Sequence, residues 1–279
     1  MSTNPKPSKR VAIMVPLSNR GTFTADEEIS LRHLRYYLGA YDRFAVVPQS
    51  LKIELPDFAL LRFEDQYFGS AANHNRLLVS PNFYRAFADY EFLLTYHLDA
   101  LVFSDKLQYW CDVGYDFIGP PWVSHADAPY RGKPLYEGKV GNGGFSLKRV
   151  AAFLDVLEAR VPAIIPGEFL RQQWGSKDWR RRLKALREYA LLHSAEYNNV
   201  RWELRRFRGN EDAFWANRAA HYYPGFRVAP VEDALRFAFE CVPSYCFELS
   251  NRQLPFGCHA WQKYDRKFWE PYLLAPDRS

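Results

Sequence analysis

The sequence lacks the features of a zinc protein, an exported protein or a membrane-spanning protein. It has only four cysteines in 279 residues, and no two of them form a Cys-x-x-Cys pair, which excludes a common zinc-site spacing. No apolar run is long enough to span a bilayer. Residues 1–10 lack the apolar core of a signal peptide, so we expect a disordered lead-in over residues 1–9 and a cytoplasmic protein. Its cysteines are then reduced, and a Cys241–Cys246 bridge is the alternative for an exported chain.

Apolar and aromatic residues are plentiful, at 48% and 17% of the chain, which predicts a folded protein with one large core or two small ones. The net charge of +5 suits an anionic partner, and much of the excess lies between Arg171 and Arg208. A solvated helix face is the ordinary interpretation of this segment. Contact with an acidic membrane surface or a phosphate-bearing acceptor is the alternative. Nucleic acid is a further one, although no binding motif supports it.

Apolar stretches of strand length alternate with stretches of helical periodicity. Strands are predicted at residues 10–16, 44–48, 58–63, 92–96, 115–119 and 226–229. Helices are predicted at residues 25–38, 73–87 with a break at Pro81, 105–111, 148–157, 179–197 and 211–217. Residues 231–239 are ambiguous, and the tail at 254–271 has no clear period. This order predicts an α/β fold with a mostly parallel sheet and helices on both faces.

The first segment with candidate functional residues runs from Glu91 to Phe103. An apolar strand leads into His97-Leu98-Asp99, and a second apolar run follows. A carboxylate among apolar residues is costly to bury unless it is paired or bound to a cation, and ligands bind at the carboxyl ends of strands in α/β sheets. Taken alone, Asp99 is better explained as a capping residue.

Three later segments carry further candidates. Residues 141–147 hold three glycines within four positions, which is typical either of a tight turn or of a place where backbone closely approaches a partner. Residues 209–215 open a helix with Glu211 and Asp212, where capping by Asn210 competes with a general-base role. Residues 254–261 carry His259, whose imidazole suits Mn²⁺ better than Mg²⁺.

These four segments, in this order, resemble the nucleotide-sugar glycosyltransferases of the GT-A fold. Members share a strand ending in a DxD motif, a glycine-rich segment, an x-E-D motif at a helix start and a late histidine. The matching elements are His97-Leu98-Asp99, Gly143-Gly144-Phe145, Asn210-Glu211-Asp212 and His259. The first acid of the DxD motif is replaced by His97.

The resemblance is closer to an uncharacterised glycosyltransferase-like domain family of bacteria and fungi, over roughly residues 10–270. The most specific strings are Gly-Asn-Gly-Gly-Phe-Ser-Leu at 141–147 and Pro-Phe-Gly-Cys-His-Ala-Trp at 255–261. The resemblance implies a single Rossmann-like GT-A domain over residues 10–274, with a basic helical insertion at about residues 165–208.

The resemblance also implies an inverting, hexosyltransferase-like enzyme that moves a sugar from a nucleotide-sugar donor to an acceptor hydroxyl. Asp212 is then the general base, with Glu211 in reserve, and Asp99 and His259 hold a divalent cation, Mn²⁺ or Mg²⁺. The donor-binding residues it implies are Pro16, Ser18, Asn75, Arg76, His97, Asp99, Gly143 and Gly144. A glycan, such as a surface polysaccharide or lipopolysaccharide, is the implied acceptor, reached at the inner face of a membrane without a transmembrane segment. The alternative is a nucleotide-sugar- or glycan-binding module that has lost catalysis.

Overall fold

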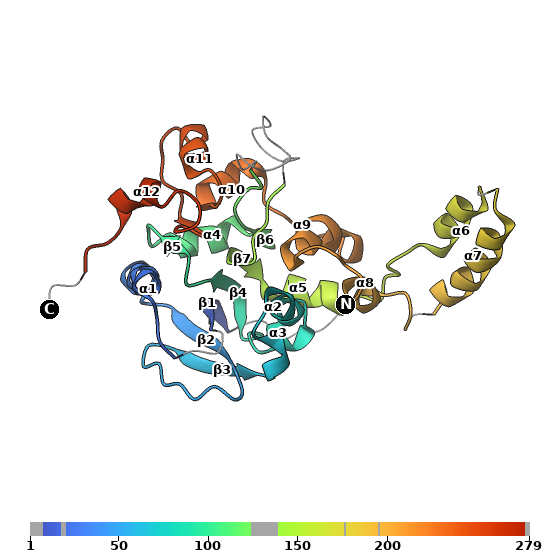
Figure 1. The fold of residues 1–279 in the computed structure, drawn as a ribbon, viewed down its shortest axis with the longest axis horizontal. Helices are drawn as coiled ribbons and strands as arrows, with labels where there is room; N and C mark the ends of the chain where they lie inside the picture. The colour runs from blue at the N-terminus through green and yellow to red at the C-terminus, as the bar shows by residue number, and fades with distance from the viewer. Residues whose placement is uncertain (1–7, 18–20, 124–138, 176, 195, 277–279) are drawn as a thin grey trace.

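A six-stranded sheet forms the centre of the molecule (Figure 1). The structure is a computed structural model and describes residues 8–17, 21–123, 139–175, 177–194 and 196–276. From edge to edge the strands are β3 (Ala59–Phe63), β2 (Asp42–Pro48), β1 (Lys9–Pro16), β4 (Tyr90–Tyr96), β7 (Phe145–Arg149) and β6 (Phe117–Ile118). The first four are parallel, and β7 runs antiparallel to both β4 and β6. The predicted mostly parallel sheet is therefore confirmed.

Helices cover both faces of this sheet, because its central strands are apolar on both sides. Along β1, Val11, Ile13 and Val15 pack on one face, whereas Ala12 and Met14 pack on the other. The first face is covered by α1 (Ala25–Leu38), α4 (Leu107–Val113) and the end of α10 (Val231–Phe237). The second face is covered by α2 (Ala71–Leu78), α3 (Pro81–Arg85), α5 (Val150–Leu157) and α9 (Glu211–Tyr222).

A smaller sheet brings the C-terminal part of the chain to the end of β4. Its order is β5 (Leu101–Val102), β9 (Gly257–Cys258) and β8 (Ala238–Phe239). The Trp261 N–H donates to the Asp99 carbonyl at 3.1 Å, so residues 162 positions apart are held together. The remaining short elements beside these sheets are α11 (Pro243–Leu249), α12 (Arg266–Trp269) and the 3₁₀ turns Asp65–Tyr67 and Glu270–Tyr272.

Several predicted elements were wrong. Lys148 lies in strand β7 rather than in a helix, because it pairs with Leu93 of β4 and Phe117 of β6. Residues 226–229 contribute only an isolated bridge from Val228 to Phe117. The ambiguous stretch 231–239 is a helix followed by a strand, and the C-terminal tail holds β9 and α12. All four cysteines are free thiols, as predicted.

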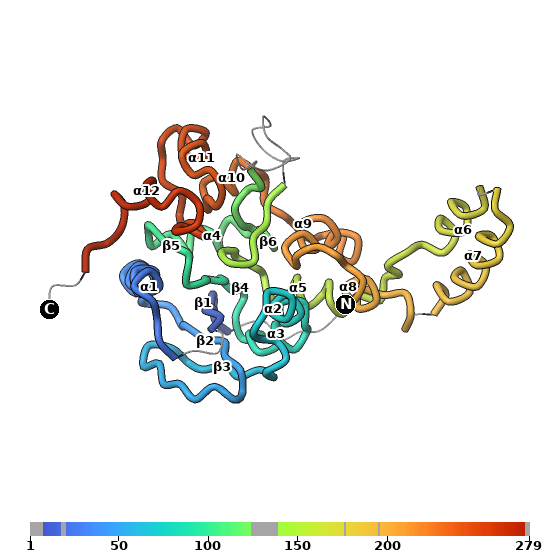
Figure 2. Tube along the Cα trace, in the orientation of Figure 1, coloured from blue at the N-terminus to red at the C-terminus, as the bar shows by residue number. Residues whose placement is uncertain are grey.

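Two helices project from the rest of the fold as an antiparallel pair (Figures 1 and 2). They are α6 (Pro166–Trp174) and α7 (Trp179–Leu192), and α8 (Val200–Leu204) follows at their base. The predicted helix at 179–197 therefore ends at Leu192. Among the described residues, no helix combines the length and the apolar character needed to cross a membrane.

Candidate active site

The four motif segments, which are far apart in sequence, meet beyond the carboxyl end of β4. His97 and Asp99 follow β4 directly, and the His97 N–H donates to the Gly144 carbonyl at 2.8 Å. Glu211 and Asp212 begin α9, and His259 follows β9. This is the edge of a parallel sheet at which α/β proteins bind their ligands.

The glycine-rich segment is packed against the other three segments. A Cβ atom on Gly144 would overlap the imidazole of His259, and one on Gly143 would lie 2.5 Å from Glu211 Oε1. A Cβ on Gly141 would lie 3.4 Å from the Cβ of Asp212. The partners that the glycines let the backbone approach are therefore side chains of the other motifs. Asn142 Oδ1 fixes the turn by accepting from the N–H groups of Gly144 and Phe145, at 2.6 and 3.0 Å.

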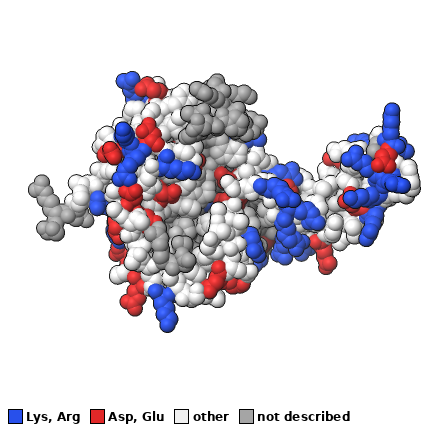
Figure 3. Space-filling model, viewed as in Figure 1, with Lys and Arg blue, Asp and Glu red and all other residues white. Residues whose placement is uncertain are grey.

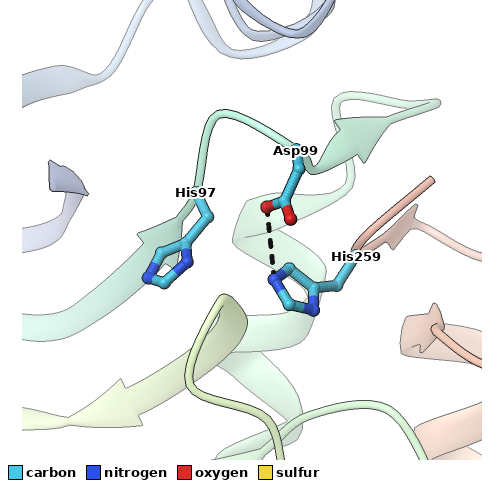
Figure 4. A group of neighbouring side chains, drawn as sticks. All are labelled: His97, Asp99 and His259. Carbon is cyan, nitrogen blue, oxygen red and sulfur yellow. Dashed lines mark ion pairs between the residues drawn. The ribbon is translucent and has the colours of Figure 1, made fainter. Parts of the chain in front are cut away.

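His97, Asp99 and His259 form one cluster (Figure 4). One ligand atom from each lies within 4.8 Å of the others, and His259 Nε2 lies 3.2 Å from Asp99 Oδ1. The rings of His97 and His259 meet edge to face, with centroids 5.6 Å apart. The Nε2 atom of His97 is buried and has no hydrogen-bond partner among the described residues, whereas that of His259 faces only Asp99. An unpartnered buried nitrogen is costly, so His97 Nε2 points to a missing ligand.

Charge is distributed unevenly within this cluster. Burial opposes protonation of His259, but its contacts with Asp99 and Glu240 outweigh burial and raise its pKa to about 9. Burial also opposes ionisation of Asp99, yet His259 and His97 lower its pKa to about 2. Burial holds the pKa of His97 well below its usual value, helped by the neighbouring His74. At neutral pH, Asp99 is thus ionised and His97 is neutral.

The donor set of this cluster fits a divalent cation. Asp99 supplies a hard oxygen, and His97 and His259 supply imidazole nitrogens, a combination that favours Mn²⁺ over Mg²⁺. Glu240 Oε1 lies 3.0 Å from His259 Nδ1, so Nδ1 donates to this carboxylate and Nε2 points to Asp99. A carboxylate behind a ligating histidine is the usual supporting arrangement at metal sites. Cation binding here requires neutral His259 and therefore releases its proton.

A buried ionisable group lies beside the start of α9. The Nζ of Lys148 donates to Thr95 Oγ1 at 2.8 Å, and its side chain is fully buried. Burial lowers the pKa of Lys148 to about 8, opposed by the charges of Glu211 and Asp212. Burial and Asp212 raise the pKa of Glu211 to about 7, opposed by Lys148. Burial likewise raises the pKa of Asp212, although its Oδ1 accepts from the Ala213 N–H at 2.8 Å. Perturbed groups of this kind are typical of functional sites.

A cleft of about 610 Å³ opens next to the cluster. It is lined by the end of β1 at Pro16, by His97 and Asp99, by the start of α1, and by the segment around Tyr67 and Phe68. The cleft therefore combines aromatic rings, carboxylates and the candidate cation ligands in one place.

Not all expected site residues share this cleft. Pro16, His97 and Asp99 line it, and Ser18 lies outside the described residues. Asn75 and Arg76 line a second cleft of about 410 Å³ with Asn210 and Glu211. The Asn75 Nδ2 donates to Asn210 Oδ1 at 3.4 Å, and Asn210 makes no side-chain cap on α9, contrary to the capping interpretation.

Sequence reasoning missed four residues of the site. They are His74, Thr95, Lys148 and Glu240. His74 contacts the ring of His97 with centroids 5.4 Å apart, and burial lowers its pKa to about 4. Lys148 had the best signal, as a lysine directly after the strand-like residues Phe145-Ser146-Leu147. Glu240 carries no motif of its own.

The fold and site define an α/β protein with a ligand cleft at the carboxyl edge of a mostly parallel sheet. Residues 57–259 match the family described as "Protein of unknown function (DUF5672)", and the chain belongs to that family. No curated protein sequence matches the chain.

Solved structures with partial similarity to this fold are glycosyltransferases. The galactosyltransferase LgtC, solved with donor and acceptor sugar analogues, has a TM-score of 0.47 and 11% identity, over 95% of this chain and 98% of its own. A glycosyltransferase that acts in glycosylation of the major capsid of PBCV-1 has a TM-score of 0.44 and 12% identity, over 94% and 98%. Apo GlyE from Streptococcus pneumoniae TIGR4 has a TM-score of 0.40 and 13% identity, over 96% of this chain; the match spans only 60% of GlyE.

Proposed function

We propose that this chain is a glycosyltransferase of the GT-A type that moves a sugar from a nucleotide-sugar donor to an acceptor hydroxyl. The observation that carries the proposal is the convergence of His97, Asp99 and His259 with the glycine-rich turn and the acidic start of α9. Four segments with the motif order of that class are packed together at one sheet edge. A capping role for Asp99 and a simple turn at residues 141–144 do not account for this packing.

The donor nucleotide occupies the cleft of about 610 Å³ in this proposal. The rings of Tyr67 and Phe68 offer apolar surface for a base, and the carboxylates of Asp26 and Glu27 offer acceptors for ribose hydroxyls. The diphosphate then points toward Asp99, where the cation ligands lie. A volume of this size suits a small-molecule site.

His97, Asp99 and His259 would hold the divalent cation. A cation bound to them would supply Lewis-acid stabilisation of the charge that develops on the leaving nucleoside diphosphate. Glu240 keeps His259 oriented through Nδ1. Gly143 and Gly144 let the carboxylate of Glu211 and the imidazole of His259 lie directly against the backbone of the turn, which fixes both side chains beside the proposed donor site.

Asp212 acts as the general base. It removes the proton from the acceptor hydroxyl, the oxygen attacks the anomeric carbon from the face opposite the leaving group, and the nucleoside diphosphate departs, so the anomeric configuration inverts. The raised pKa of Asp212 supports this role, because a stronger base accepts a proton more readily. Glu211 is less suited, since it is deeply buried and faces Gly143 and Lys148.

The decisive experiment has two stages. A thermal-shift panel of UDP-, GDP-, dTDP- and CMP-sugars, with and without Mn²⁺, identifies the donor, because a ligand of the native state raises the melting temperature. Turnover of that donor is then measured for the wild type and for Asp212→Asn, which should retain donor binding and lose about 10²–10⁴-fold in rate. Asp89→Asn is the matched control, because Asp89 precedes β4 at the opposite edge of the sheet.

Each outcome has a clear meaning. Normal turnover by Asp212→Asn removes Asp212 as the base. If the wild type binds the donor tightly but shows neither sugar transfer nor slow donor hydrolysis, the protein is the alternative, a binding module. Asp99→Ala should weaken Mn²⁺ binding, and unchanged Mn²⁺ titration would overturn the assignment of the cation site.

A further inference from the structure

The projecting helix pair has almost no core of its own. We define the arm as residues 166–192, which comprise α6 and α7. No residue of α6 is buried, and α7 buries only Ala185 and Leu192. The arm extends away from the α/β sheet in Figure 1, so the central domain does not cover these helices.

The arm exposes large apolar side chains to an unusual degree. Trp179 is 63% exposed, Leu183 57% and Trp174 50%. Trp179, Leu183 and Leu186 are spaced i, i+4, i+7 and therefore share one face of α7. An apolar groove of about 570 Å³ runs between the two helices. Its lining residues are Gly167, Leu170, Arg171, Trp174, Gly175 and Leu186.

The same helices are basic. Residues 166–192 contain seven Lys or Arg and three Asp or Glu, a net charge of +4 out of +5 for the whole chain. Blue side chains cover much of the visible surface of the arm in Figure 3. Guanidinium groups also lie over the exposed indoles: Arg180 is 5.6 Å from the centre of Trp179, and Arg182 is 5.8 Å from that of Trp174.

We propose that the arm docks this protein onto an anionic lipid bilayer. A helix with Trp and Leu on one face and Lys and Arg on the other lies in a bilayer interface, with its apolar face among the acyl chains and its charges near anionic headgroups. One surface of this kind accounts for both the exposed apolar side chains and the charge. It also accounts for the indoles, which favour the headgroup region.

Two other occupants explain less. A second copy of the chain would cover the apolar face but would bring two arms of charge +4 together. A nucleic acid would neutralise the arginines but would leave Leu183 and Leu186 in water. The docking proposal rests on the arm alone and does not depend on the proposed function.

The test is sedimentation of the full chain with vesicles of 70% phosphatidylcholine and 30% phosphatidylglycerol, and with vesicles of phosphatidylcholine alone. We expect binding to the anionic vesicles that falls steeply between 20 and 500 mM NaCl, because screening weakens the headgroup attraction. The triple variant R180Q/R181Q/R182Q should bind on the order of 100-fold more weakly. K52Q/K263Q/K267Q removes the same charge from exposed positions outside the arm and should bind like the wild type.

The apolar contribution is tested separately. W179S/L183S should also lose binding, whereas Y36S/Y245S, which removes exposed aromatic rings elsewhere, should not. A second measurement uses the wild type itself. Vesicles of brominated lipids should quench its tryptophan fluorescence, and they should quench the fluorescence of W174F/W179F much less.

Several results would overturn the proposal. They are absence of wild-type binding, equal binding to both vesicle types, or equal weakening by the two triple variants. Light scattering that shows an arm-dependent dimer would assign the face to a second copy. Binding to duplex DNA or RNA that exceeds vesicle binding and is lost in R180Q/R181Q/R182Q would assign it to nucleic acid.

Discussion

Gly144 is the residue at which the packing of the site leaves the least room. Gly144→Ala places a methyl group on the imidazole of His259, so the ring must move away from Asp99. We expect Mn²⁺ affinity to fall at least tenfold and stability to fall by about 1–3 kcal/mol, the usual cost of overpacking. Calorimetric Mn²⁺ titration and urea unfolding measure the two effects. Gly167→Ala in α6 is the control, because nothing lies within 4 Å of its added methyl group. Wild-type Mn²⁺ affinity in Gly144→Ala would contradict this account.

Glu211 makes stability depend on pH. The folded protein retains the Glu211 proton up to a pKa of about 7, whereas the carboxyl has an ordinary value of 4.5 in the unfolded chain. The folded state therefore binds more protons between these values, and the free energy of unfolding falls as pH rises from 4.5 to 7. The stability of the wild type relative to Glu211→Gln should decline by about 1–3 kcal/mol across this window.

Urea unfolding at several pH values, with EDTA present, measures this difference. The exposed Glu54→Gln is the control, and its stability relative to the wild type should stay constant over the same range. A pH-independent difference for Glu211→Gln would show that Glu211 is not buried as a protonated group.

At the scale of helices and strands, the pattern of apolar residues predicted the bounds of an element well where that element is apolar throughout. The strands β1, β2 and β4 were predicted to within two residues, because each is a run of residues buried on both faces. The same reasoning failed for Lys148, which was predicted to begin a helix. It is a charged residue in the middle of β7, and its burial depends on Thr95 and Glu211, which come from distant parts of the chain.

The start of α1 gives a prediction at this scale. Thr24 and Glu27 form a capping box, in which Thr24 Oγ1 accepts from the Glu27 N–H at 3.3 Å and Glu27 Oε2 accepts from the Thr24 N–H at 2.7 Å. Thr24→Ala should lower the free energy of unfolding by about 1 kcal/mol, whereas Thr24→Ser retains the cap. Both residues line the cleft that we propose for the donor, so Thr24→Ala should also weaken binding of the donor found in the thermal-shift panel. Equal stability of the two variants in urea unfolding would refute the cap.

The sequence predicted most members of the candidate site but not its geometry. Asp99, the glycines, Glu211, Asp212 and His259 were singled out by the order of their motifs, and the structure brings them together. Glu240 and His74 were not, because they belong to no motif and reach the site only through the folding of β8 and α2. The proposal that His97 is a metal ligand also required the structure, since only the fold shows its ring beside His259.

The arm gives a prediction for the whole molecule. Asn198 joins the two ends of the arm. The Oδ1 of Asn198 accepts from the Ile164 N–H at 2.9 Å, and its Nδ2 donates to the carbonyls of Ile164 and Leu192 at 2.7 and 2.8 Å. The two ends of the arm are thus held together at the domain, and Val200 is buried in the core next to them. Replacing residues 166–196 with a short Gly-Ser linker should therefore leave the central domain folded.

We expect the variant without the arm to unfold within a few degrees of the wild type and to retain the proposed Mn²⁺ and donor binding, because the cleft and the candidate cation ligands lie in the central domain. Its binding to anionic vesicles should be lost. Differential scanning calorimetry, Mn²⁺ titration and vesicle sedimentation measure these properties. A variant that no longer folds would show that the arm stabilises the core. Retained vesicle binding would move the membrane contact to another surface, and lost Mn²⁺ binding in a folded variant would mean that the arm acts on the site.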